Sequence, residues 1–143
     1  VSVSLHPEAA AYRINTKVIH FHPRFILVNS TRRSIEYCQV GTDYSEVLSP
    51  GDRRALHQTD SALANILSVR FHGFGWQWAA RKHGLSLDTV GVLSFRMRNT
   101  HTHEIAILHV YTRLDRATFQ ITVDDLEAEP VPYRIENATL HTL

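Results

Sequence analysis

Side chains that could hold a metal ion gather in the last third of the sequence. His101, His103 and Glu104 lie within four residues of one another, and His109 follows them. Two or three histidines and a carboxylate that converge on one ion are a common ligand set for iron or zinc. The pattern therefore predicts metal-dependent catalysis, provided that the fold brings these side chains together.

The local sequence weakens this metal-site interpretation. His101 and His103 follow Asn99 in a polar stretch typical of a turn, where side chains are free to point apart. The second segment of a cupin-like β-barrel, with a proline, a glycine and a further histidine, does not follow them in the chain. We keep a metal-dependent, cupin-like enzyme using His101, His103 and His109 as the alternative, and predict no catalytic residue, no metal and no cofactor.

Other reactive groups are sparse. There is no G-x-S-x-G and no phosphate-binding glycine loop, and Cys38 is the one cysteine. Two arginine pairs, Arg32-Arg33 and Arg53-Arg54, occur in expected turns and would contact lipid headgroups if they converged. A lipid- or carbohydrate-binding β-sandwich is therefore a third hypothesis, although solvated turns explain the same pairs.

Composition restricts the class of protein. The chain has 143 residues, of which 43% are hydrophobic and 20% charged, as expected for one folded domain. A formal net charge of +1 gives no general attraction to nucleic acid. No apolar run is long enough to span a bilayer, and no signal peptide is visible, so we expect a cytosolic protein. Because the first residue is Val, we expect a piece of a longer chain.

The elements that must position these side chains have a period of two. Apolar and polar residues alternate in four segments, as in half-buried antiparallel strands. In the first segment Phe25, Leu27 and Asn29 share one face. The other three segments are 67–71, 93–98 and 118–123.

The remaining segments complete the predicted fold. Residues 105–111 are apolar on both faces, which predicts a central strand. Residues 60–66 and 79–83 alone look weakly helical. Turn residues separate the many short strands, so the sequence predicts an all-β protein folded as an antiparallel β-sandwich.

One pattern occurs twice. Residues 25–31 and 133–139 both read aromatic, any, aliphatic, any, Asn, any, Thr, and Asn29 and Asn137 are 108 residues apart. This spacing suits a β-sandwich unit. We therefore expect residues 1–130 to be one repeat of a tandem β-repeat array, with a core at about 17–130. Residues 131–143 would then form the first strand of the following repeat.

The repeated asparagine falls on the face that should be buried. A buried amide without partners costs about 1–3 kcal/mol. We therefore expect Asn29 to hold the backbone of a neighbouring loop at the strand end rather than to contact a ligand.

Several short motifs along the chain form a recognisable series. They are segments 25–29, 35–39, 48–51, 68–70, 76–78, Gly91 and 132–137. Together and in this order they resemble the adaptor-binding repeats of the chorein, or vacuolar protein sorting thirteen, family. The sequence departs from the family pattern after Trp78, where Ala79-Ala80 replace the usual Ser or Pro.

The resemblance implies a non-enzymatic protein-interaction module of a bridge-like lipid transfer protein. In that family such repeats receive Pro-x-Pro-type motifs of organelle adaptors, which direct the protein to membrane contact sites of the endosome or vacuole and of mitochondria. The implied partners are these adaptors and neighbouring repeats of the same chain, without nucleic acid. Association with membranes would be peripheral, through the adaptors.

The resemblance also suggests how a peptide would bind. An extended peptide could add to a sheet edge, and prolines at positions i and i+2 would face the same way. They would need an apolar or aromatic surface beside the edge, for which Tyr44 and Trp78 are further candidates, with Trp78 expected in the core. The predicted partner-binding residues are Asn29, Tyr37, Gln39, Trp76 and Asn137.

Overall fold

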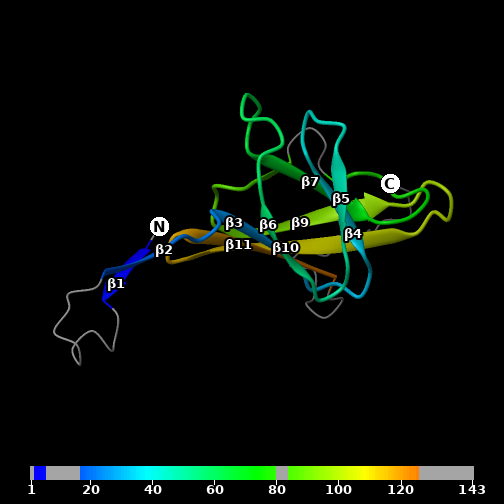
Figure 1. The fold of residues 1–143 in the computed structure, drawn as a ribbon. Helices are drawn as coiled ribbons and strands as arrows, with labels where there is room; N and C mark the ends of the chain where they lie inside the picture. The colour runs from blue at the N-terminus through cyan, green and yellow to red at the C-terminus, as the bar shows by residue number, and fades with distance from the viewer. Residues whose placement is uncertain (1, 6–16, 80–83, 126–143) are drawn as a thin grey trace, which may run out of the picture.

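The computed structural model describes residues 2–5, 17–79 and 84–125, which form eleven β-strands and no helix (Figure 1). The strands in chain order are β1 (Ser2–Leu5), β2 (Lys17–His20), β3 (Phe25–Asn29), β4 (Ile35–Gln39), β5 (Ser45–Leu48), β6 (Arg53–Leu56), β7 (Ile66–Phe71), β8 (Leu85–Ser86), β9 (Gly91–Arg98), β10 (Ile105–Asp115) and β11 (Thr118–Asp124).

Two sheets pack face to face. The five-stranded sheet has the order β6-β3-β11-β10-β9, and the four-stranded sheet has the order β5-β4-β7-β8. The β1–β2 pair lies beyond one end of these sheets (Figure 1). The predicted all-β sandwich is confirmed, with one difference in strand direction. β3 and β11 pair in parallel, which is possible because no tight turn joins them and forces them to run in opposite directions.

The inner faces of both sheets supply the core. Phe25, Leu27 and Asn29 of β3 are buried and alternate with half-buried residues, as the period of two predicts. Leu67, Val69 and Phe71 of β7 face them from the other sheet. The alternation therefore identifies the buried side of these strands correctly.

β10 is a central strand with one buried and one partly exposed face. It lies between β9 and β11, so the prediction of a central strand is confirmed. Leu108 and Val110 on the inner face are fully buried, whereas Ile105 and Ile107 on the outer face are 50% and 41% exposed. The apolar residues of the outer face stay accessible because no described element covers that face here.

Neither segment that was predicted to be weakly helical forms a helix among its described residues. Residues 60–65 form turns and bends, and β7 begins at Ile66, so the helix predicted over 60–66 is wrong. Side-chain hydrogen bonds from Gln39 hold this segment in its turns, in competition with helical backbone bonds. In the second segment Ala79 forms a β-bridge with Val69, and residues 80–83 lie outside the described part of the chain.

Candidate functional site

Asn29 fastens the two sheets together at the end of β3. Its side-chain amide nitrogen donates to the carbonyl oxygens of Arg33 and Leu48, both at 2.9 Å. Its Oδ1 accepts from the backbone N–H and the hydroxyl of Thr31 at 2.9 and 2.7 Å. The side chain is fully buried, so the predicted backbone clamp is confirmed and no polar atom of Asn29 faces solvent.

Gln39 makes a similar clamp at the end of β4. Its Nε2 donates to the carbonyl oxygens of Asp60 and Ala64, and its Oε1 accepts from the backbone N–H groups of Thr59 and Asp60. These bonds fix the loop between β6 and β7. Gln39 therefore positions a loop, and its amide has no bonding capacity left over for a partner.

A third amide clamp was missed in the sequence. Asn99, just after β9, donates to the carbonyl oxygen of Phe74 at 2.9 Å and accepts from the N–H groups of His101 and Thr102. The side chain is buried, and it lies so close to Gly75 that a Cβ there would come within 2.4 Å of Oδ1. An asparagine directly before a polar turn was the available signal.

The two tryptophans occupy different environments. Trp76 is buried and packs edge-on against Phe71, with ring centres 5.1 Å apart. Trp78 is half-buried on the outer side of the four-stranded sheet, so its predicted core position is wrong. The guanidinium of Arg70 lies 4.4 Å from the Trp78 ring centre and pairs with Glu36 at 2.8 Å. Packing of Arg70 on the indole explains why Trp78 stays near the surface.

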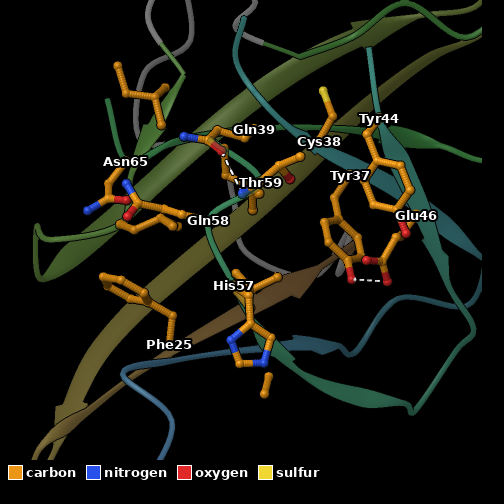
Figure 2. A pocket seen from close by; sticks show the side chains of 15 residues that line it. Phe25, Tyr37, Cys38, Gln39, Tyr44, Glu46, His57, Gln58, Thr59 and Asn65 are labelled. Carbon is orange, nitrogen blue, oxygen red and sulfur yellow. Dashed lines mark hydrogen bonds between the residues drawn. The ribbon is translucent and has the colours of Figure 1, made fainter. Parts of the chain in front are cut away.

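A small pocket opens at the seam between the edge strands β5 and β6 (Figure 2). We call it the seam pocket. Its volume is about 80 Å³, comparable to one aliphatic side chain. The buried Oδ1 of Asn65 in its wall has no hydrogen-bond donor among the described residues. The pocket is lined by Phe25, Tyr37, Cys38, Gln39, Tyr44, Glu46, Ala55, Leu56, His57, Gln58, Thr59, Asn65, Ile66, Leu67 and Leu87.

A carboxylate at the rim of the seam pocket joins the two edge strands. Glu46 of β5 accepts a hydrogen bond from the Tyr37 hydroxyl at 3.0 Å and pairs with Arg54 of β6. The bond from Arg54 holds the pKa of Glu46 below its ordinary value, against the opposing effect of burial. Burial raises the pKa of Tyr37 to about 12, and the adjacent carboxylate adds to this shift. The Tyr37 hydroxyl therefore stays protonated at neutral pH.

The seam pocket combines an apolar cavity with strand edges. β5 and β6 each pair with one described neighbour, β4 and β3 respectively, so each has a second edge that no described strand occupies. Tyr37 is buried in the pocket wall, and Tyr44 is 58% exposed at its rim. The arrangement can receive one apolar side chain of an extended polypeptide while the backbone of that polypeptide bonds to an edge.

The histidines proposed for a metal site have separate partners. His101 packs against the Phe74 ring, His103 contacts Arg98, and His109 hydrogen-bonds with Ser94. No group of three metal-ligating side chains occurs among the described residues. The fold therefore does not bring His101, His103 and His109 together.

The arginine pairs are largely engaged in ion pairs. Arg32 pairs with Asp125, Arg33 with Glu104, and Arg54 with Glu46. They lie on different elements and do not gather into one basic site with Arg53. None of the described segments is a helix that could cross a membrane.

Two of the five predicted partner-binding residues line the seam pocket, and two others lie in the core. Tyr37 is buried in the pocket wall, and Gln39 lines the pocket while it holds the loop between β6 and β7. Asn29 and Trp76 lie in the core. Asn137 lies outside the described residues, so the environments of Asn29 and Asn137 are not compared.

Comparison with known proteins points to one family. Residues 1–143 match the family described as vacuolar-sorting associated protein 13, adaptor binding domain. The chain is 25% identical to intermembrane lipid transfer protein vps13B of Dictyostelium discoideum, in an alignment of 136 residues that covers 87% of the chain. It is 22% identical to intermembrane lipid transfer protein vps13D of the same organism, in an alignment of 126 residues that covers 85% of the chain. It spans 2% and 3% of the lengths of these relatives.

Proposed function

The chain belongs to the adaptor binding domain family of vacuolar-sorting associated protein 13, and from this premise we propose that it binds Pro-x-Pro-type peptides of organelle adaptors in the seam pocket. Membership of this family makes the chain a protein-interaction module. The peptide class and the position of its binding site are our proposal. The module would act by binding and not by catalysis.

The seam pocket is the observation that carries this proposal. It is large enough for one pyrrolidine ring, and its walls include the rings of Phe25, Tyr37 and Tyr44. Proline packs well on aromatic surfaces and loses little conformational entropy when it binds. The pocket therefore suits one proline of the motif, with the second on the rim near Tyr44.

An extended peptide with two prolines could still form backbone hydrogen bonds to a strand edge of this protein. In an extended peptide the prolines at i and i+2 direct their backbone nitrogens to the same side, which can face solvent. The residue between them directs its N–H and C=O to the opposite side, where they can pair with the edge of β5 or β6. The motif thus keeps its backbone hydrogen bonds despite the two missing donors.

Fluorescence anisotropy with a labelled Pro-x-Pro peptide tests this proposal. We expect Tyr44→Ala to weaken binding about ten-fold, because a large part of the rim is lost. Replacement of both peptide prolines by alanine should weaken binding similarly. Phe74→Ala is the matched control, since Phe74 is 84% exposed and does not line the pocket. Binding that Tyr44→Ala leaves unchanged would place the peptide elsewhere.

The other predicted site residues would act on binding indirectly. Asn29, Gln39 and Trp76 fix the backbone and core behind the pocket, whereas Tyr37 forms part of its wall. We propose that Asn137 has the role of Asn29 in a following unit. On this basis residues 1–130 form one repeat and residues 131–143 begin the next.

The wider role follows from the longer relatives, both of which are named as intermembrane lipid transfer proteins. We propose that the chain is part of such a bridge-like protein and directs it to membrane contact sites of the endosome or vacuole and of mitochondria. It would stay cytosolic and attach peripherally through adaptors, with neighbouring repeats as further partners. Removal of residues 131–143 tests the boundary, since we expect the shortened chain to self-associate in size-exclusion chromatography. A monodisperse shortened chain would contradict the boundary.

A further inference from the structure

The outer face of β9 and β10 carries exposed aliphatic side chains beside arginines. In the register of these strands Ile105 lies opposite Arg98, and Ile107 lies opposite Arg96. Val92 lies on the same outer face, opposite Tyr111. We call Val92, Arg96, Arg98, Ile105 and Ile107 the outer patch.

The aliphatic members of the outer patch are unusually accessible. Val92 is 61% exposed, Ile105 50% and Ile107 41%. The inner face of the same strands contains the fully buried Leu108 and Val110, so the exposure does not arise from a general absence of packing. Apolar residues on the outer face of a sheet that is otherwise well packed indicate a surface that contacts something else.

Positive charge exceeds negative charge on this face. Arg96, Arg98 and Arg113 are exposed on it, and the acidic residues in the same rows of β10 and β11 are Asp115 and Asp124, the latter opposite His109. Arg98 contacts the ring of His103 at 3.2 Å instead of a carboxylate. In contrast, Arg32, Arg33 and Arg54 elsewhere on the surface are paired with acids. The outer patch therefore has positive charge available for an anionic partner.

We propose that the outer patch binds the surface of an anionic lipid bilayer directly. The outer patch is an exposed face of two paired strands. An exposed, open face can contact a broad surface such as a bilayer, whereas a side chain of a protein partner would need a cavity to enter. Arg96 and Arg98 would pair with lipid phosphates, and the aliphatic side chains would enter the headgroup region.

This contact would be weak in an isolated unit. A few arginines and three aliphatic side chains give modest, salt-sensitive attraction, in line with other single-signal membrane contacts. A second attachment by an adaptor peptide would raise the effective concentration of the patch at the bilayer. Attachment of the chain to a membrane would then depend both on the adaptor peptide and on the charge of the lipids. The dependence on lipid charge is additional to the proposed peptide binding.

Co-sedimentation with vesicles tests the proposal. The 143-residue chain should bind vesicles of equal parts phosphatidylcholine and phosphatidylserine, and should not bind phosphatidylcholine alone. Arg96→Gln with Arg98→Gln should weaken this partitioning about thirty-fold, which corresponds to about 1 kcal/mol for each arginine. Ile107→Ser should weaken it as well, because an apolar contact is lost without a change of charge.

A double variant with the same change of net charge is the control. Arg24→Gln with Arg32→Gln removes two exposed arginines that pair with Asp88 and Asp125, outside the outer patch, and should retain most of the binding. Equal loss in both double variants would show that net charge alone drives binding, and would overturn the proposal. No sedimentation of the folded chain with the anionic vesicles would also overturn it. The peptide titration is a separate measurement, so either proposal can fail without the other.

Discussion

The amide nitrogen of Asn29 donates a hydrogen bond to the carbonyl oxygen of Leu48 at 2.9 Å, and this bond joins the end of β3 in one sheet to the end of β5 in the other. The same nitrogen reaches Arg33, and Oδ1 holds Thr31. One side chain thus fixes both the turn after β3 and the spacing of the sheets.

Asn29→Ala should reduce the free energy of unfolding by about 3 kcal/mol, because it leaves buried backbone groups without partners. Thermal melts and urea titrations measure the loss, and peptide binding should fall with it. If binding disappeared while the melting curve stayed unchanged, Asn29 would contact the peptide directly and its role as a clamp would be wrong.

Asn29→Asp should be more destabilising at neutral than at acidic pH. A carboxylate would face two carbonyl oxygens, so its folded-state pKa would rise above the unfolded value of about 3.9. Stability would then be highest below the unfolded pKa and would fall as pH rises through the folded pKa. Urea midpoints across the acidic range test this sign, with the native chain as reference.

Gly75→Ala should destabilise the turn that Asn99 holds. Gly75 has φ +85°, and an added Cβ would lie 2.4 Å from Asn99 Oδ1. We expect a loss of about 3 kcal/mol from strain and displacement of Asn99. Gly51→Ala is the control, because Gly51 has φ +79° with nothing within 4 Å, and it should cost only about 1–2 kcal/mol. Equal losses in thermal melts would contradict a special contact at Gly75.

Gln39→Ala should loosen the loop above the seam pocket. The variant removes four hydrogen bonds to the backbone of Thr59, Asp60 and Ala64, and we expect a loss of about 2 kcal/mol. Amide hydrogen exchange in this loop should become faster, and peptide binding should weaken. Gln120→Ala, on the outer face of β11, should change stability by less than about 0.5 kcal/mol.

Folding stability should decrease at alkaline pH because of Tyr37. Its folded-state pKa is about 12 against an ordinary value of 10.0, so the folded chain retains the proton longer than the unfolded chain. The contribution is complete below pH 10.0 and is lost as pH rises towards about 12. Tyr37→Phe should remove this slope in urea titrations, whereas Tyr44→Phe, at an exposed position, should retain it.

The sequence determined the parts of this protein that depend on local periodicity and on the needs of buried polar groups. Alternation predicted the sandwich and the buried face of β3. The position of Asn29 on that face predicted a backbone clamp, because a buried amide must find partners. The order of the short motifs indicated the family that the comparison then identified.

Only the tertiary structure decided what covers each face and which distant residues meet. Alternation shows that Ile105 and Ile107 are apolar, but it cannot show that the sheet leaves them uncovered. Likewise, the pocket between Tyr37 and Leu56 exists because β5 and β6 end two different sheets at one seam. The parallel β3–β11 pair joins segments about ninety residues apart, beyond the reach of any local pattern. Periodicity records the chemistry of a strand's sides, whereas burial depends on neighbours that the rest of the chain supplies.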